Sequence, residues 1–167
     1  FEPGGVCPFG VTGVEVIRFK EAHWIWVKIH TDTGVFGLGE TYPFSNAEYG
    51  ALKDLVRVIL GRDPRDIEGI WKQLYTRAAF NVTGGAEMRI ISALDIALWD
   101  LLGKIYDIPV YRLLGGKARE SIRVYNTTNG LGDWNNKEHI EQITEFLLEK
   151  GIHAMKIWPF DPTARRN

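Results

Sequence analysis

A lysine stands in the middle of an otherwise apolar run near the end of the 167-residue chain, in the segment 152–160. This residue is Lys156. Trp158 follows two positions later, so both side chains point to one face if the segment is a strand. Burial disfavours the ammonium form of a lysine, and a neutral lysine can accept a proton. Two interpretations of Lys156 stay open: a group that does chemistry, or a structural lysine paired with a carboxylate on a neighbouring strand.

The segments around this lysine predict a strand, a helix and a second strand. Residues 121–128 and 152–160 have the composition of strands, and residues 137–151 that of a helix capped by Asn135. A strand–helix–strand of this length is typical of a βαβ unit, whose two strands are parallel and buried. Thr127 lies near the end of the first strand, where it could bind a carboxylate or begin a loop.

A pair of parallel strands is not a finished sheet, because its faces and edges need cover. The simplest closed form of a repeating β/α pattern is the eight-fold barrel, of typically about 250 residues. Most of such a barrel lies outside this chain, and we expect the chain to be a piece of a longer protein. We place a domain boundary near Gly116, between a first domain of residues 1–116 and an incomplete barrel in residues 117–167.

The part of the chain before that boundary predicts an α+β domain that begins with a three-stranded antiparallel meander. Its strands are the β-branched and aromatic segments 14–19, 23–30 and 35–40. The last two strands are separated by a turn at residues 31–34.

Three helices should follow the meander. Ser45 and Glu48 form a capping-box pattern that predicts the start of the first helix, which should end at Gly61. The second helix is expected within residues 63–80, and the third within residues 88–108. Since the third helix is apolar nearly all round, we expect it at the centre of the domain.

Composition narrows the classes of protein that the chain can belong to. A formal net charge of -1 gives no electrostatic argument for a nucleic-acid or membrane partner. The apolar stretches are shorter than the roughly 20 residues that span a bilayer. The single cysteine, Cys7, excludes an internal disulfide framework and favours a cytoplasmic location. The four histidines, His23, His30, His139 and His153, show no metal-ligand spacing.

The segment "SALDIALWDLLGKIYDIPVYRLLGG", residues 92–116, resembles the hallmark of the mandelate racemase and muconate lactonizing enzyme group of the enolase superfamily. The resemblance covers nearly the whole chain, including the meander that ends in "GLGE". It implies an α+β capping domain of three antiparallel strands and helices, followed by the first strand–helix–strand of a (β/α) barrel. The capping domain sits over the mouth of that barrel.

The resemblance also implies a chemistry and a cofactor. Enzymes of this group remove a proton next to a carboxylate, and a bound Mg²⁺ stabilises the enediolate. The Mg²⁺ ligands are expected on barrel strands outside this chain, so we assign no metal ligand to it. Such a proton is a very weak acid, so its removal needs fixed positive charge and a base whose pKa is near neutrality.

In the racemase-like branch of the group, the second barrel strand ends in a Lys-x-Lys motif. By that register Lys156 corresponds to the first lysine, which faces the substrate carboxylate, and Trp158 replaces the second, which is usually the base. Lys156 is therefore our candidate catalytic residue, and Trp158 is either packing or a wall of the substrate pocket. Alternatively, the base comes from the far side of the barrel, as does the His–Asp pair of the acid-sugar dehydratases.

Other polar and aromatic residues have both a functional and a structural interpretation. Tyr42, Phe44 and Asn81 lie in segments that correspond to loops over the barrel mouth, where they either contact substrate or stay at the surface. Asp95 and Asp100 are not at the positions of the group's metal ligands, and we interpret both as structural. Lys104 stands four residues after Asp100, a spacing that predicts an ion pair on one helix.

The function expected from these observations is Mg²⁺-dependent dehydration of a sugar acid in a cytoplasmic homo-oligomer, with a small carboxylate as substrate. The runner-up is a racemase, epimerase or cycloisomerase of the same superfamily. A hypothesis of another class is a non-catalytic member, or a capping domain with a role only in assembly.

Overall fold

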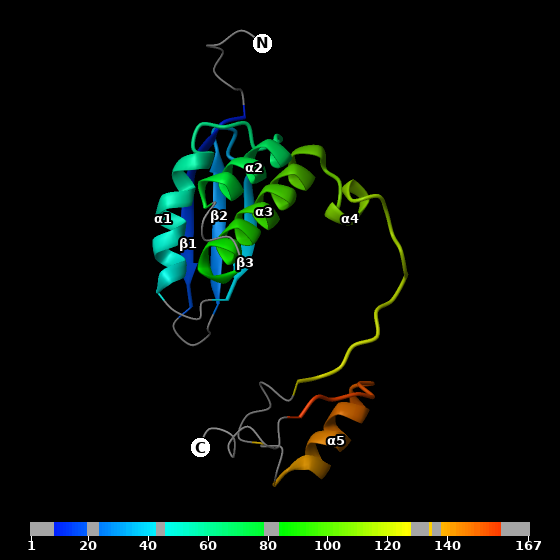
Figure 1. Cartoon of the computed structure of the whole chain (residues 1–167). Helices are drawn as coiled ribbons and strands as arrows, with labels where there is room; N and C mark the ends of the chain where they lie inside the picture. The colour runs from blue at the N-terminus through cyan, green and yellow to red at the C-terminus, as the bar shows by residue number, and fades with distance from the viewer. Residues whose placement is uncertain are drawn as a thin grey trace. The chain divides into compact units, whose positions relative to one another are not determined.

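The computed structural model describes residues 9–19, 24–42, 46–78, 84–127, 134 and 138–157. The chain divides into two compact units, Phe1–Lys117 and Ala118–Asn167, and each is described by itself. The elements of the first unit are β1 (Val11–Arg18), β2 (Ile25–Thr31), β3 (Phe36–Thr41), α1 (Ala47–Ile59), α2 (Ile67–Arg77), α3 (Gly85–Tyr106) and α4 (Val110–Leu113) (Figure 1). The second unit contains α5 (Ile140–Glu149).

The three strands form one antiparallel sheet in the order β1-β2-β3, which confirms the predicted meander. β1 begins at Val11, three residues before the predicted strand of residues 14–19. Two backbone hydrogen bonds hold this early part: Val11 N–H donates to Arg62 O at 2.9 Å, and Gly61 N–H donates to Val11 O at 2.8 Å. The turn that follows α1 thus holds the start of β1 in place.

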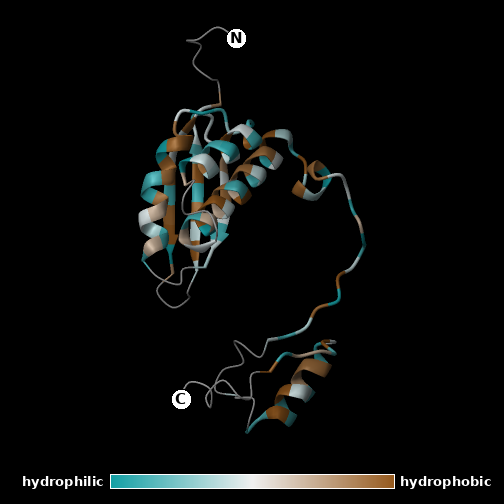
Figure 2. Cartoon of the chain, viewed as in Figure 1, coloured by the Kyte–Doolittle hydropathy of each residue, from teal (hydrophilic) through white to brown (hydrophobic). Residues whose placement is uncertain are grey.

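One face of the sheet carries the core of the first unit, because side chains alternate between faces along a strand. Ile25, Val27 and Ile29 of β2 are buried, whereas the residues between them are half-buried. The helices α1, α2 and α3 lie across this face (Figure 1), and the strands beneath them are largely apolar (Figure 2).

α3 is the central helix, as its apolar sequence predicted. Its buried residues are Ile90, Ile91, Ala93, Leu94, Ala97, Leu98, Leu101 and Gly103. The helix packs so closely on β3 that a Cβ atom added at Gly39 would overlap the carbonyl oxygen of Ala93, and one at Gly37 would overlap that of Ala97. Gly37 and Gly39 have no side chain, and this allows α3 to lie so close to β3.

The ends of the helices differ from the predicted ones by a few residues. α1 begins after Asn46, so the predicted N-cap Ser45 is wrong by one position, and Ser45 itself is outside the described residues. α3 begins at Gly85, earlier than predicted, and ends because Asp107 adopts a left-handed conformation with φ of 53°. A short helix, α4, follows Pro109 and was not predicted.

α2 begins at Ile67, four residues later than the predicted start at 63, because Asp66 is its N-cap. The Asp66 carboxylate accepts a hydrogen bond from the backbone N–H of Gly69 at 3.2 Å, which satisfies one of the unpaired donors of the first turn. The turn before it is fixed by an ion pair between Asp63 and Arg65 at 2.6 Å.

We expect the variant Asp66→Ala to lower the free energy of unfolding by about 1 kcal/mol, since it removes this helix cap. Thermal unfolding followed by circular dichroism should show a Tm lower by about 3 °C. Asp54→Ala is the matched control, because Asp54 is exposed in the middle of α1. An equal loss in both variants would contradict the capping role of Asp66.

In the second unit, the two predicted parallel strands are reduced, within the described residues, to a single parallel bridge between Asn126 and Met155. The predicted strands are wrong in extent because a parallel pair depends on neighbours that cover its faces and edges. α5 begins after His139 instead of the predicted Asn135, which lies outside the described residues. The helix is followed by Gly151 with a φ of 72°, as predicted.

Among the described residues, no helix is both long and apolar enough to cross a bilayer.

Candidate functional site

The parallel bridge of the second unit brings Thr127 and Lys156 side by side in the chain register. Asn126 N–H donates to Ala154 O at 3.0 Å, and Lys156 N–H donates to Asn126 O at 2.8 Å. Because these bonds pair Asn126 with Met155, Thr127 and Lys156 are the next residues along the two segments, at the same end of the bridge. Two of the predicted site residues are therefore neighbours in the register of the bridge.

Thr127 and Lys156 share one face of the bridge, because side chains alternate along extended chain and Asn126 lies opposite Met155. Met155 itself lines a small hollow together with Leu147 and Leu148 of α5. In a β/α barrel, the side chains of a strand that point away from the helices face the barrel interior.

The expectation that the segment around Lys156 is fully buried is wrong for the described residues. Lys156 is exposed, and the side chain of Ile157 is 41% exposed. On the partner segment, Ile122 and Val124 are also exposed, at 73% and 59%. A strand that is apolar on both faces is buried only when neighbours cover both faces, and within the described part of this unit the two segments are accompanied only by α5.

Of the other predicted substrate-binding residues, the structure describes only Tyr42. Tyr42 follows β3 in the first unit and is 43% exposed. Phe44, Asn81 and Trp158 are outside the described residues. Of the six predicted site residues, the structure therefore describes three, Thr127 and Lys156 in one unit and Tyr42 in the other.

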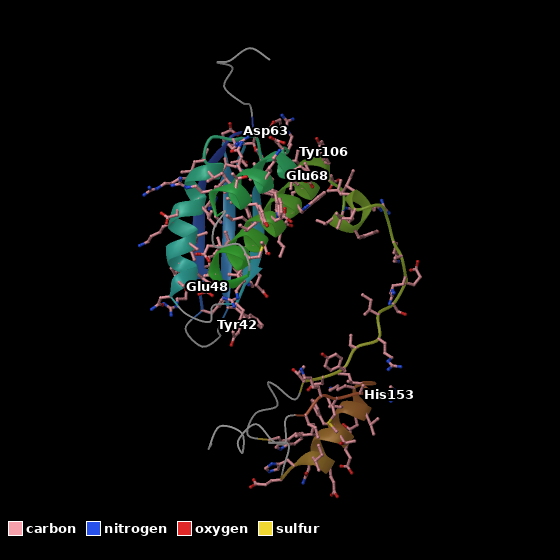
Figure 3. The ribbon with its side chains drawn as sticks, viewed as in Figure 1. Tyr42, Glu48, Asp63, Glu68, Tyr106 and His153 are labelled. Carbon is pink, nitrogen blue, oxygen red and sulfur yellow. The ribbon has the colours of Figure 1, made fainter. Side chains whose placement is uncertain are left out.

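A buried ion pair in the first unit was not predicted from the sequence. Glu48, in the first turn of α1, is fully buried, and its carboxylate accepts a hydrogen bond from the Arg89 guanidinium at 2.7 Å. Glu48 and Tyr42 lie at the same end of this unit, and Asp63 lies at the other end (Figure 3). The capping-box pattern drew attention to Glu48, but nothing in that local pattern points to a partner 41 positions away.

The surroundings of Asp95 and Asp100, the two aspartates of α3, indicate that both have structural roles. The Asp100 carboxylate accepts from the backbone N–H of Leu38 at 2.8 Å and from Lys104 Nζ at 2.6 Å, which confirms the predicted pair with Lys104. Burial raises the pKa of the Asp95 carboxyl above its usual value of 3.8, and the negative charge of Glu68 raises it further. The pKa shift of Asp95 is thus explained by packing between α2 and α3.

Among the described residues, no three His, Cys, Asp or Glu side chains come together in a way that could hold a metal ion. Mg²⁺ ligands were expected on barrel strands outside this chain, and Mg²⁺ binding stays a prediction.

The fold shows what class of protein the chain belongs to. The first unit is an α+β domain whose three-stranded meander is covered on one face by three helices, and a separate β/α segment follows it. Residues 11–115 match the family model of the mandelate racemase / muconate lactonizing enzyme N-terminal domain. The chain therefore belongs to this family. The match confirms both the resemblance found in the sequence and the predicted capping domain.

Relatives of known name agree with this assignment. A D-galactonate dehydratase from Variovorax paradoxus is 35% identical over 136 residues, which cover 80% of this chain and 34% of that protein. A D-mannonate dehydratase from Novosphingobium aromaticivorans is 38% identical over 119 residues, which cover 69% of this chain and 29% of that protein. The chain thus spans about a third of the length of these relatives.

A solved structure extends the similarity to both units. The crystal structure of an enolase of the mandelate racemase subgroup from Agrobacterium tumefaciens is 37% identical, with a TM-score of 0.77. The alignment covers 95% of this chain and 40% of that one.

Proposed function

We propose that this chain is part of a Mg²⁺-dependent dehydratase of sugar acids. The observation that carries the proposal is the similarity to relatives named D-galactonate dehydratase and D-mannonate dehydratase, at 35% and 38% identity. The two names differ in the sugar acid and agree in the reaction. We therefore propose dehydration as the reaction and a polyol carboxylate as the substrate.

The reaction needs a base and fixed positive charge around the substrate carboxylate. A base removes the proton from the carbon next to the carboxylate, and the electron pair of that C–H bond moves into the carboxylate. The electrons then return to form a C=C bond, the hydroxyl group on the next carbon leaves with a proton as water, and the enol becomes a 2-keto-3-deoxy acid. Mg²⁺ supplies charge stabilisation of the doubly negative intermediate.

We assign Lys156 and Thr127 to the carboxylate end of such a substrate. In support, they are the next residues after the Asn126–Met155 bridge, at the same end of it. In our proposal the Lys156 ammonium provides positive charge to the carboxylate, or its neutral amine accepts the proton, and the Thr127 hydroxyl donates a hydrogen bond to a carboxylate oxygen.

The proposed capping-domain contacts come from Tyr42, Phe44 and Asn81, with Trp158 as a wall beside Lys156. The polar groups among them suit the hydroxyls of a polyol acid. The cytoplasmic location and the homo-oligomeric state also stay predictions of the sequence.

The test is turnover by the complete protein. D-Galactonate and D-mannonate are each incubated with the protein and Mg²⁺, and the 2-keto-3-deoxy acid is measured by its reaction with semicarbazide. We expect one of these or a related hexonate to be dehydrated. Formation of an epimer or a lactone without loss of a hydroxyl group would favour the racemase, epimerase or cycloisomerase alternative, and no turnover of any acid would favour the assembly role.

Removal of the metal provides a separate prediction. We expect excess EDTA to reduce turnover by the complete protein to background, because the intermediate carries two negative charges that need a cation. Re-addition of Mg²⁺ should restore the rate, and the same amount of EDTA saturated with Mg²⁺ is the control. Full activity after dialysis against EDTA would contradict the metal dependence.

A further inference from the structure

One face of the sheet lies away from α1, α2 and α3 (Figure 1). When the second face of an antiparallel sheet meets water, it usually carries polar side chains. Here the positions that alternate with the buried ones hold Ile17 of β1, Trp26 of β2, and Phe36 and Leu38 of β3. We call this surface the outer face and define it by Ile17, Trp26, Lys28, Phe36, Leu38 and Glu40. Apolar side chains grouped in this way are typical of a surface that binds another molecule.

At one end of the outer face, aromatic rings lie beside a carboxylate. Phe19 packs edge-on against Trp26, with the ring centres 4.8 Å apart. Trp24, directly before β2, is 50% exposed. Trp26 Nε1–H donates a hydrogen bond to Glu40 Oε2 at 3.0 Å. Glu40 is exposed, so its negative charge marks this end of the outer face.

At the other end of the outer face, two ammonium groups lie against the ring of Phe36. Lys28 Nζ is 4.2 Å and Lys104 Nζ is 4.4 Å from the ring centre, within the range of cation–π attraction. Each ammonium group also has an acidic neighbour. Glu15 lies 3.7 Å from Lys28 Nζ, and Asp100 lies 2.6 Å from Lys104 Nζ. Since these charges are paired within the chain, covering them costs less than covering isolated charges.

We propose that the outer face binds the outer face of a second copy of this chain, around a two-fold axis that crosses the strands. Such an axis lays β3 of one copy over β3 of the other in the opposite direction, as in two sheets packed face to face. Glu40 of each copy then faces the ammonium groups around Phe36 of the other copy. The inference goes beyond the proposed function and does not depend on the reaction.

The distribution of charge is what selects a second copy as the partner. A partner of the outer face must carry apolar side chains, with a positive charge opposite Glu40 and a negative charge opposite the Phe36 end. The same face in reversed direction meets this condition, and it does so twice, because each copy supplies both ends. Buried aromatic side chains supply most of the affinity of such a contact, and opposite charges fix its orientation.

The test is an exchange of charges in the complete protein. Lys28→Glu places a negative charge opposite Glu40 of the second copy, and Glu40→Lys places a positive charge opposite Lys28. We expect each single variant to raise the dissociation constant of the assembly at least about tenfold. The double variant Glu40→Lys/Lys28→Glu restores opposite charges and should return to within about threefold of the wild type. Sedimentation velocity at a series of concentrations measures the dissociation constants.

Lys53→Glu is the matched control, because Lys53 is exposed on α1, on the other side of the sheet. This variant should assemble as the wild type does. The Tm of each variant should stay within about 4 °C of the wild type, since the replaced side chains lie outside the core. A monomeric wild type, single variants that assemble as the wild type does, or a double variant weaker than both single variants would overturn the proposal.

Oxidation of the wild type by hydroxyl radicals gives an answer even if a variant does not fold. Phe36 and Trp24 are 39% and 50% exposed in the single chain. In the assembled protein, we expect both rings to be oxidised at least about tenfold more slowly than in the urea-unfolded chain, because a central contact excludes water. Oxidation in proportion to the two exposed fractions would contradict the proposal. So would protection of both rings in a monomeric protein, because the cover would then come from the same chain.

Discussion

The variant Lys156→Met of the complete protein should have a kcat/KM for its sugar acid at least about a hundredfold below that of the wild type. This is the scale expected when a positioned acid–base or electrostatic group is lost. Lys156 and Thr127 directly follow Met155 and Asn126, which form the only parallel bridge among the described residues. Methionine keeps the length and apolar stem of the side chain but carries no charge, so steady-state kinetics report the loss of the amine.

Two further variants make this result specific. Lys150→Met is the matched control, since Lys150 is exposed at the end of α5, where its amine lies 5.6 Å from the ring centre of Phe146. Lys156→Arg separates the two roles left open for Lys156: it should retain most activity if the residue only pairs with the carboxylate, and little if it is the base. Near wild-type turnover by Lys156→Met would show that Lys156 is structural.

The variant Gly39→Val should destabilise the first unit by about 3 kcal/mol or more, or unfold it. A Cβ atom at this position would overlap the Ala93 carbonyl oxygen, which belongs to the backbone of α3 and is not free to rotate away. The helix would have to move off the sheet, and most of the buried core lies between these two elements. Urea unfolding followed by tryptophan fluorescence measures the change.

Gly50→Ala is the control for this substitution. Gly50 lies in α1, and a Cβ atom added there meets no other atom within 4 Å. Alanine at an open helical position should leave stability unchanged or raise it by about 0.5–1 kcal/mol. If both glycine variants changed the urea midpoint by similarly small amounts, α3 would not be held as closely to β3 as the structure describes.

Local sequence was enough to predict the main elements of the first unit. The β-branched and aromatic composition of residues 23–30 predicted a strand, and the continuous apolar surface of residues 88–108 predicted the central helix. The first residues of the helices were predicted less accurately, because several residues near Ser45 and Asp66 can each serve as an N-cap. Only packing of the whole unit selects among them.

The second unit shows the limit of the same reasoning. The apolar segments of residues 121–128 and 152–160 have the composition of barrel strands, yet only Asn126 and Met155 pair within the described residues. Strand formation in a parallel sheet depends on distant neighbours, and local sequence carries no information on whether they are present.

The candidate site was predicted only in part for a similar reason. The resemblance supplied the register that singled out Lys156, and the bridge places Thr127 beside it. The Glu48–Arg89 pair was missed because its residues are 41 positions apart and neither belongs to a recognisable motif with the other. Contacts over such distances become visible only when α1 and α3 are packed together.

The hydrogen bonds of Asp100 and Lys104 have a consequence for the free edge of the sheet. β3 is an edge strand, and its Leu38 N–H donates to Asp100 while its Phe36 carbonyl accepts from Lys104 Nζ at 3.0 Å. Both backbone groups are thus occupied by side chains of α3 instead of being offered to another strand. Unpaired edge strands promote aggregation, because another strand can add to them. The side chains of Asp100 and Lys104 oppose such an addition at β3.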